Sequence, residues 1–300
     1  MNRPKIANFL DFVRTSKTSP PDSTPALARF SNLAGTSYKR HIQSLHEHGD
    51  RRNPDILASA LMTEEERNQC LVLKNDLLTE MRKDAYYHYL TARTKAYDQL
   101  LLDAVVQGFR RVLIVGSGFD TRFYRFGGLL AKRGVEVAEC DQPAAIAVKK
   151  SLAAALPYAD RVEYFDIDLN IPQSWSSVWR WLGATPNPVL ILAEGVSPYI
   201  ESSAFLLFLD TLAKHLPSSS RLAYDFKRIG VADGFGVSAT VTSPYRLSLD
   251  EPAIAELHAR LGFCSASVTT SFGLMRAHIP SWSEQVSPLF DEDAMIQAVR

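Results

Sequence analysis

From Arg111 onward, short apolar runs alternate with stretches whose apolar residues recur at helical spacing. Five of the runs have the composition of strands: "RVLIVG", "VEVAECD", "RVEYFDID", "PVLILAEGV" and "RLAYDF". Runs this continuously apolar fit strands that are buried on both faces, and the helical stretches between them are the crossovers that parallel strands need. The pattern predicts an α/β domain with a doubly wound, mostly parallel sheet.

The preceding part of the chain has a different pattern. Glu66 follows Thr63 by three positions in "TEEER", which is the capping-box signature of a helix start. The next residues keep helical periodicity as far as Gly108, a residue type common at helix ends. We therefore expect residues 1–108 to form a helical cover that contributes to the site, and residues 109–300 to form the α/β domain.

Two features follow the fifth predicted strand. The segment "KRIGVADGFGVSATVTSPYRLSLDEP" is rich in glycine, serine and turn residues, so we expect a lid insertion near residues 227–250. Next, "FCSASVTTSFGLMRAHIP" holds two β-rich runs close together. Too little chain separates these runs for a helical crossover, which predicts an antiparallel hairpin at the sheet edge. The expected result is a seven-stranded sheet.

Composition narrows the function classes. Hydrophobic residues make up 46% of the 300-residue chain, enough for a packed core. Lysine plus arginine equals aspartate plus glutamate at 33 each, so no net field attracts nucleic acid or an anionic membrane. The sequence has no apolar run of spanning length and no secretion signal at its start. Its three cysteines indicate neither a disulfide framework nor a zinc cluster. We expect a soluble, cytoplasmic protein without nucleic-acid or membrane partners.

A glycine turn follows the first predicted strand. Gly116 and Gly118, separated by Ser117, leave the backbone open to a ligand because neither carries a side chain. Asp120 and Thr121 are both good caps for the next helix, whose first N–H groups would face that ligand. Thr121 stands where G-x-G-x-x-G requires its third glycine, so the dinucleotide fingerprint is incomplete. By itself the turn is also consistent with a plain strand-to-helix connection.

Acidic residues end the next three predicted strands. Asp141 lies close to the roughly 20-residue spacing from the turn at which an acid meets a ribose. Glu139 is its alternative, or else a solvated strand-end charge. Asp166 and Asp168 compete for an adenine contact at the third strand. Glu194 ends a strongly apolar run, where burying a carboxylate without a partner is costly, so it is a strong candidate for ligand binding in the crevice.

Four sequence blocks occur in the order found in a known family: "ARTKAYDQLL", "GSGFDTRFYR", "ECDQP" and "AEGVSPYI". Over about residues 85–275 the chain resembles the leucine carboxyl methyltransferase and polyketide O-methyltransferase group of S-adenosylmethionine-dependent enzymes. The resemblance implies the Rossmann-like sheet of class I methyltransferases, which has an antiparallel edge, with S-adenosylmethionine as the cofactor.

By position, the resemblance also implies a cofactor site. Arg93 would pair with the methionine carboxylate, Asp141 would hold the ribose, and Glu194 would contact the amino group region. The cofactor-binding residues that it implies are Arg93, Gly116, Ser117, Gly118, Asp120, Asp141, Asp166, Ile167 and Glu194. Lys39 is a candidate second partner for the carboxylate. Ile114 stands where many class I methyltransferases carry an acid, so the predicted site depends more heavily on Arg93 and Glu194.

The expected activity is O-methylation of a carboxylate or hydroxyl on a small, polyketide-like acceptor. Methylation of a protein's carboxyl-terminal leucine is the alternative within the family, and an NAD-dependent oxidoreductase or a non-catalytic cofactor-binding protein is the alternative outside it. A carboxylate needs no catalytic base, whereas a hydroxyl usually does, and no base stands out. Tyr199 is a candidate for the acceptor pocket. The histidines His41, His46, His48 and His88 lie in the predicted cover, and the H-x-H pair is too little for a metal site.

Overall fold

The computed structural model describes residues 25–62, 64–71, 75–231 and 241–300. Thr63 of the predicted capping box, the first 24 residues of the predicted cover, and the centre of the predicted lid at 232–240 lie outside these ranges.

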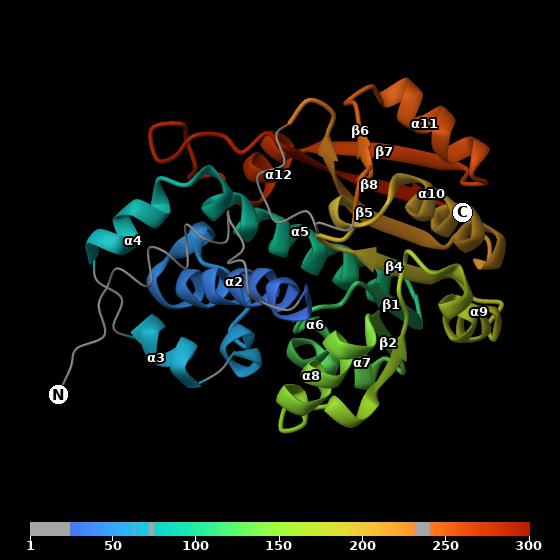
Figure 1. The fold of residues 1–300 in the computed structure, drawn as a ribbon, viewed down its shortest axis with the longest axis horizontal. Helices are drawn as coiled ribbons and strands as arrows, with labels where there is room; N and C mark the ends of the chain where they lie inside the picture. The colour runs from blue at the N-terminus through green and yellow to red at the C-terminus, as the bar shows by residue number, and fades with distance from the viewer. Residues whose placement is uncertain (1–24, 63, 72–74, 232–240) are drawn as a thin grey trace.

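An eight-stranded sheet forms the centre of the molecule (Figure 1). The strands are β1 (Arg111–Val115), β2 (Glu136–Asp141), β3 (Val162–Asp166), β4 (Val189–Ala193), β5 (Arg221–Arg228), β6 (Arg246–Leu247), β7 (Ser265–Thr270) and β8 (Asp293–Val299). Their spatial order is β3-β2-β1-β4-β5-β8-β7, with β6 paired to β5 outside this path. All five strands predicted from apolar runs are present, and their pairings with one another are parallel. The prediction of a mostly parallel sheet with an antiparallel edge is confirmed.

The antiparallel part of the sheet is built differently from the predicted hairpin. The first β-rich run is β7, but the second run forms the helix α12 (Ser271–His278). Thr270 Oγ1 accepts a hydrogen bond from Gly273 N at 3.1 Å and so caps this helix, while Leu274 and Met275 are buried against the sheet. The predicted second strand is therefore wrong, and β8 pairs antiparallel with both β5 and β7 instead.

Helices cover both faces of the sheet. On one face lie α5 (Ala85–Val106), α6 (Arg122–Arg125), α7 (Gly127–Lys132) and α12. On the other lie α9 (Ser176–Gly183), α10 (Ser202–His215) and α11 (Glu251–Arg260). α8 (Pro143–Ala153) follows β2 and packs beside β3. Because the strands are buried between two helical layers, their continuous apolar composition is explained.

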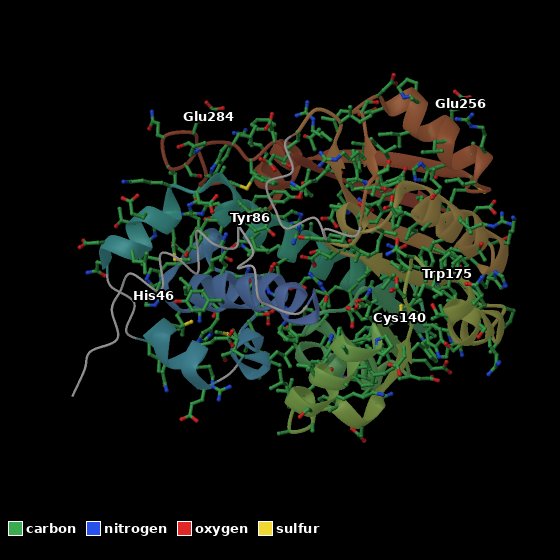
Figure 2. All side chains as sticks on the ribbon, in the orientation of Figure 1. His46, Tyr86, Cys140, Trp175, Glu256 and Glu284 are labelled. Carbon is green, nitrogen blue, oxygen red and sulfur yellow. The ribbon has the colours of Figure 1, made fainter. Side chains whose placement is uncertain are left out.

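The helical cover packs on the amino-terminal half of α5. It contains α2 (Pro25–His46), two short 3₁₀ turns (Gly49–Arg51 and Ala58–Leu61), α3 (Glu64–Leu71) and α4 (Asn75–Arg82). Its apolar core includes Tyr38, Ile42, Met62, Cys70, Leu78, Met81 and Tyr87. In Figure 2, His46 lies in this cover, whereas Cys140 and Trp175 lie on the sheet side of the molecule. Within the described ranges, none of the helices combines the length and the apolar character that a membrane span requires.

Candidate cofactor site

The glycine turn is held against the end of β2 by backbone hydrogen bonds. Ser117 N donates to Cys140 O at 3.1 Å, and Gly118 N donates to the Asp141 carboxylate at 2.7 Å. Gly116 and Gly118 have φ values of 61° and 43°, a region that residues with a side chain rarely occupy. Two neighbouring strands therefore fix the turn at the carboxyl edge of the sheet, where open α/β sheets bind their ligands.

Gly116 has no room for a side chain. A Cβ atom at this position would overlap Val196 Cγ2, in addition to the strained φ. We expect Gly116→Ala to lower the free energy of unfolding by about 1–3 kcal/mol. Urea denaturation measures this change. Adding Val196→Ala should recover part of the loss by removing the overlap but not the backbone strain.

Gly183→Ala is the matched control, because a Cβ there meets nothing within 4 Å and φ is not positive. Equal stabilities of the Gly116→Ala protein and the wild type would contradict the prediction.

The residues after the turn connect the sheet to the cover. Asp120 Oδ1 accepts a hydrogen bond from Arg122 N at 2.7 Å, so Asp120 caps α6 as predicted. Thr121 occupies the N-cap position of α6, as predicted, but its hydroxyl makes no bond to the helix backbone. It donates instead to the buried Asp55 at 2.5 Å and accepts from Arg125 Nε at 2.9 Å. Thr121 therefore ties the start of α6 to the cover.

Asp141 is oriented by the backbone around it. Its two carboxylate oxygens accept hydrogen bonds from Gly118 N and Gln142 N, each at 2.7 Å. A carboxylate oriented in this way is the group that a pair of ribose hydroxyls requires. The structure thus places Asp141 beside the turn and fixes its side chain, as a ribose contact needs.

The two aspartates near the end of β3 differ in their partners. Asp168 accepts hydrogen bonds from Gln142 Nε2 at 3.0 Å and Asn170 N at 2.9 Å, so it organises the local loop. Asp166 is exposed, and its side chain has no hydrogen bond within the described residues. The next residue, Ile167, is buried, with its N–H bonded to Asp141 O at 2.8 Å. This arrangement favours Asp166 over Asp168 as a ligand contact.

Glu139 is not a solvated charge, so that alternative is wrong. Its side chain and that of Lys149 on α8 are both fully buried and lie 2.6 Å apart. Burial raises the pKa of Glu139 to about 7, although the Lys149 ammonium opposes the shift. Lys149 Nζ also lies 3.4 Å from Ser117 O, beneath the glycine turn. The sequence analysis did not identify Lys149, although its spacing from Ile146 and Ala153 places it on the buried face of α8.

Arg93 reaches the carboxyl ends of β4 and β5 from α5. Its Nε donates to Glu194 at 3.0 Å, Nη1 to Asp225 at 3.1 Å, and Nη2 to the Tyr86 hydroxyl at 3.2 Å. Asp293, at the start of β8, lies 3.8 Å away. The structure therefore joins Arg93 and Glu194 directly in an ion pair, which the sequence did not predict, and their roles in cofactor binding stay predictions.

Asp225 is a site residue that the sequence analysis did not identify. It accepts hydrogen bonds from Gly195 N at 2.6 Å and from the Tyr97 hydroxyl at 3.2 Å, besides the one from Arg93. The signal was present, because an aspartate inside the apolar run "RLAYDF" needs a buried partner for the same reason as Glu194.

Glu194 is held between two guanidinium groups. Its second oxygen lies 2.7 Å from Arg122 Nη2. Burial alone would raise the pKa of Glu194, but the charges of Arg122 and Arg93 bring it below its usual value. Glu194 is therefore ionised at neutral pH.

These contacts belong to one continuous ion-pair network across the site. It contains seven carboxylates (Asp55, Asp98, Asp120, Glu194, Asp225, Glu292 and Asp293) and five cations (Arg40, Arg93, Arg122, Arg125 and Lys227). Within the described residues, the network thus carries two more acids than bases. Most of its members were not identified from the sequence, because their partners lie far away along the chain.

Lys39 and Tyr199 lie near Arg93. The Lys39 ammonium is 4.9 Å from the centre of the Tyr86 ring and 3.4 Å from the Asp84 carboxylate. Tyr199 ends the 3₁₀ turn Ser197–Tyr199 after β4 and is partly exposed. Burial raises the pKa of its hydroxyl, and the charge of Tyr86 adds to the shift. Both residues are therefore placed where a ligand at Arg93 would meet them.

The histidines of the cover do not form a site. His41 and His88 are buried, and His48 is exposed. Among the residues that the structure describes, no group of three or more histidine, cysteine or acidic side chains is arranged to hold a metal ion.

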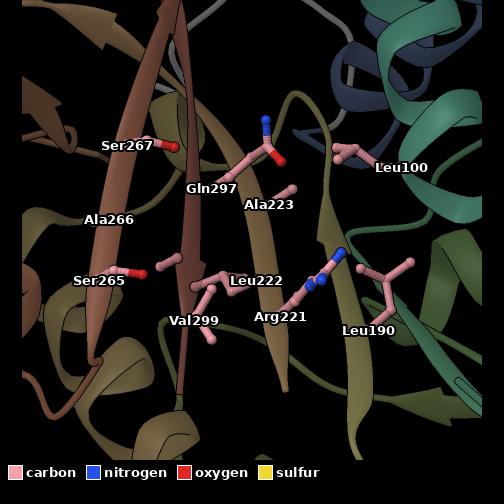
Figure 3. A pocket seen from close by; sticks show the side chains of 11 residues that line it. Leu100, Leu190, Arg221, Leu222, Ala223, Ser265, Ala266, Ser267, Gln297 and Val299 are labelled. Atoms are coloured by element: carbon pink, nitrogen blue, oxygen red, sulfur yellow. The ribbon is translucent and has the colours of Figure 1, made fainter. Parts of the chain in front are cut away.

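A cavity of about 230 Å³ lies at the edge of the sheet opposite to the glycine turn, where the parallel strands begin (Figure 3). The pairing of β4 with β5 starts at Leu190 and Arg221, and both residues line the cavity. Ser265 and Ser267 on β7 and Val299 on β8 line it as well. Because these positions are at the amino ends of the parallel strands, the cavity is separate from the Arg93 and Glu194 cluster.

Comparison with known proteins agrees with this geometry. A protein of Mycolicibacterium gilvum (strain PYR-GCK) named "Putative S-adenosyl-L-methionine-dependent methyltransferase" is 31% identical over 137 residues, which are 45% of this chain and 44% of that protein. A protein of the same name from Mycolicibacterium paratuberculosis is 34% identical over 135 residues, 45% of this chain and 43% of the relative. The chain therefore matches under half the length of these curated relatives.

A solved structure supports the fold. The structure described as a "putative methyltransferase" from Thermobifida fusca YX has a TM-score of 0.53 and 13% identity, covering 84% of this chain and 96% of that one. The sequence profile of the leucine carboxyl methyltransferase family matches residues 35–213, which is more than half of the chain and includes the turn, Arg93, Asp141 and Glu194. The chain belongs to the leucine carboxyl methyltransferase family.

Proposed function

We propose that this protein is an S-adenosylmethionine-dependent O-methyltransferase that acts on a small-molecule acceptor. The observation that carries the proposal is the acid surplus of the ion-pair network beside the glycine turn. S-adenosylmethionine has a positive sulfonium and a positive amino group besides one carboxylate. A surplus of carboxylates around the site balances this net positive charge. The names of the Mycolicibacterium relatives agree with this proposal.

The residues present fit the cofactor at three points. Asp141 is oriented for the ribose beside the turn. Ser117 Oγ is buried and has no hydrogen-bond partner among the described residues, so a polar ligand group can supply one. Arg93 and Lys39 both lie over the Tyr86 ring, and the Tyr86 hydroxyl is a neutral partner of Arg93. A carboxylate that displaces this hydroxyl would meet two cations.

When bound, the cofactor supplies an electrophilic methyl group. The chain's task is then to bind the cofactor and to hold the acceptor oxygen roughly 3–3.5 Å from the methyl carbon in line with the breaking bond. We assign Glu194, fixed between Arg93 and Arg122, to the amino group of the cofactor. We assign the adenine contact to Asp166 alone, because the N–H of Ile167 already donates to Asp141 O.

Two other carboxylates argue against an NAD-dependent oxidoreductase. A pyrophosphate above the turn would lie near Asp120 and Glu194, whereas phosphate sites present N–H groups and cations. The helix after the turn, α6, has only four residues.

Isothermal titration calorimetry with S-adenosylmethionine and with NAD tests the proposal. We expect S-adenosylmethionine to bind more tightly than NAD. The absence of S-adenosylmethionine binding to folded protein would overturn the proposal.

Incubation with methyl-labelled cofactor and three acceptor classes identifies the acceptor. The classes are phenols, aromatic carboxylic acids and a peptide ending in leucine. Label on the peptide alone would indicate the protein carboxyl methyltransferase alternative. Cofactor binding without label on any acceptor would favour a non-catalytic binding protein.

A further inference from the structure

Asp293 and Asp225, two buried carboxylates of the ion-pair network, differ in their partners. Asp225 uses both oxygens for Arg93, Gly195 N and the Tyr97 hydroxyl. In contrast, Asp293 Oδ1 meets Lys227 Nζ only at 3.4 Å, and Oδ2 lies 3.8 Å from Arg93. Within the described residues, Oδ2 makes no hydrogen bond. Asp293 therefore has an oxygen that can accept a proton from a ligand.

The order of the strands shows where this oxygen lies relative to the cofactor. Under the proposed function, the adenine lies at the end of β3, the ribose at β2, and the methionine part between β1 and β4. Next to β4 come β5 and β8. β8 is antiparallel, so its first residue lies at the carboxyl edge of the parallel strands, where Lys227 pairs with Asp293. Asp293 is thus on the side of the cofactor where the methyl acceptor must approach.

The surroundings of Asp293 discriminate between acceptor types. The neighbouring carboxylates are Glu292, Asp225 and Glu194, and the neighbouring cations are Lys227 and Arg93. Negative charges therefore outnumber positive charges around Asp293. An acceptor carboxylate would meet this excess of like charge. Tyr86 and Tyr199 lie beside Asp293 and are partly exposed. Burial is the main cause that raises the pKa of both tyrosine hydroxyls, and the charge of Asp293 is a smaller cause in the same direction. An aromatic ring bearing a neutral hydroxyl fits these surroundings.

We propose that Asp293 is the general base for a phenolic acceptor; this inference rests on the proposed function. The acceptor O–H bond breaks and its proton passes to Oδ2 of Asp293. A bond forms between that oxygen and the methyl carbon of the sulfonium cofactor. The bond from methyl carbon to sulfur breaks, and its electron pair stays on sulfur, which becomes a neutral thioether. Asp293 is slightly exposed, so it returns the proton to solvent.

Burial supports this role by raising the pKa of Asp293 to about 6, with Lys227 opposing and Asp225 adding to the shift. The other charged or titratable groups that face it are Arg93, Tyr86 and Tyr89 on α5, Tyr199 after β4, and Glu292 beside it. A base must be ionised to act. Turnover of a phenol should therefore be lost as the pH falls through about 6.

Asp293→Asn tests the proposal in the full-length chain. We expect kcat/KM for methylation of a weakly acidic phenol to fall by about 10²–10⁴-fold. The affinity for S-adenosylmethionine should fall much less, because the other six carboxylates of the network remain. The residual turnover should no longer be lost as the pH falls through about 6. The loss should shrink for 4-nitrophenol, which ionises without help. Asp291→Asn, the same substitution at an exposed residue two positions away, is the control. Equal phenol turnover in the Asp293→Asn protein and the wild type would overturn the role, as would methylation of benzoate but no phenol.

A second readout does not depend on turnover. The absorbance of 4-nitrophenol reports its ionisation when it is bound to the complex with S-adenosylhomocysteine. The Asp293 carboxylate should favour the protonated phenol, so bound 4-nitrophenol should ionise at a higher pH in the wild type than in Asp293→Asn. Identical titrations, or no binding of 4-nitrophenol to the wild-type complex, would overturn the proposal. If S-adenosylhomocysteine itself does not bind, the proposed function fails instead.

Discussion

Replacing Arg93 by alanine is expected to abolish measurable S-adenosylmethionine binding and to lower the free energy of unfolding by about 3–5 kcal/mol. Arg93 is the shared partner of Glu194, Asp225 and Asp293. Its removal leaves Asp225 buried without a cation, whereas Glu194 keeps its contact with Arg122 and Asp293 keeps its contact with Lys227. Under the proposed function, it also removes the planar guanidinium group that would bind the cofactor's carboxylate.

Urea denaturation and calorimetry separate the two effects of Arg93. Arg93→Lys keeps the positive charge but not the planar guanidinium group that can bind a carboxylate by two hydrogen bonds. We therefore expect this variant to keep most of its free energy of unfolding but to lose much of its affinity for S-adenosylmethionine. Arg228→Ala is a control, because its pair with Asp291 is largely exposed and should contribute under about 1 kcal/mol. Full cofactor affinity in a folded Arg93→Ala protein would show that the arginine has only a structural role.

Replacing Asp141 by alanine is expected to weaken S-adenosylmethionine binding by about 100-fold or more. Hydrogen bonds to a charged group contribute about 1.5–3 kcal/mol each, and under the proposed function Asp141 would accept two from the ribose. The substitution also frees Gly118 N, so the glycine turn loses a support. Calorimetry gives the affinity, and Asp168→Asn serves as the control in the neighbouring loop.

A cofactor analogue separates the ribose contact from the effect on the turn. S-adenosylhomocysteine without its 2′ and 3′ hydroxyls should bind the wild type much more weakly than the intact compound. The same comparison in Asp141→Ala should show little difference, because the two changes remove the same interaction. Additive losses would place the ribose elsewhere.

The sequence predicted the architecture because that architecture depends on local patterns. The runs ending at Val115 and Ala193 are apolar throughout, and each forms a strand buried between helical layers. The prediction failed where a local signal was ambiguous. In "SVTTSFGLM" the β-rich composition was misleading, since Thr270 caps a helix at that point. β8 was not identified, because its pairing with β5 and β7 depends on segments far from it in the chain.

For the site, the sequence indicated which strands carry functional residues but not how these residues pair. Arg93 meets Glu194 across 101 positions and Asp225 across 132. No spacing rule covers such separations. Glu139 shows the same limit, since its burial became evident only once Lys149 was placed against it from α8. A sequence shows which acidic residues stand in apolar runs. The basic residues that pair with them can be identified only from the three-dimensional structure.

The reversed direction of β8 divides the site between loops that follow strands and a segment that precedes one. The parallel strands bring their final residues to the cofactor, so changes in the loops after β1, β2 and β3 affect cofactor recognition. At the acceptor end the chain enters β8 instead, and the segment 279–292 leads into it. That segment can change in length and composition without disturbing the turn or Asp141. Under the proposed function, an enzyme of this kind can acquire a new acceptor by altering one loop while the cofactor half stays as it is.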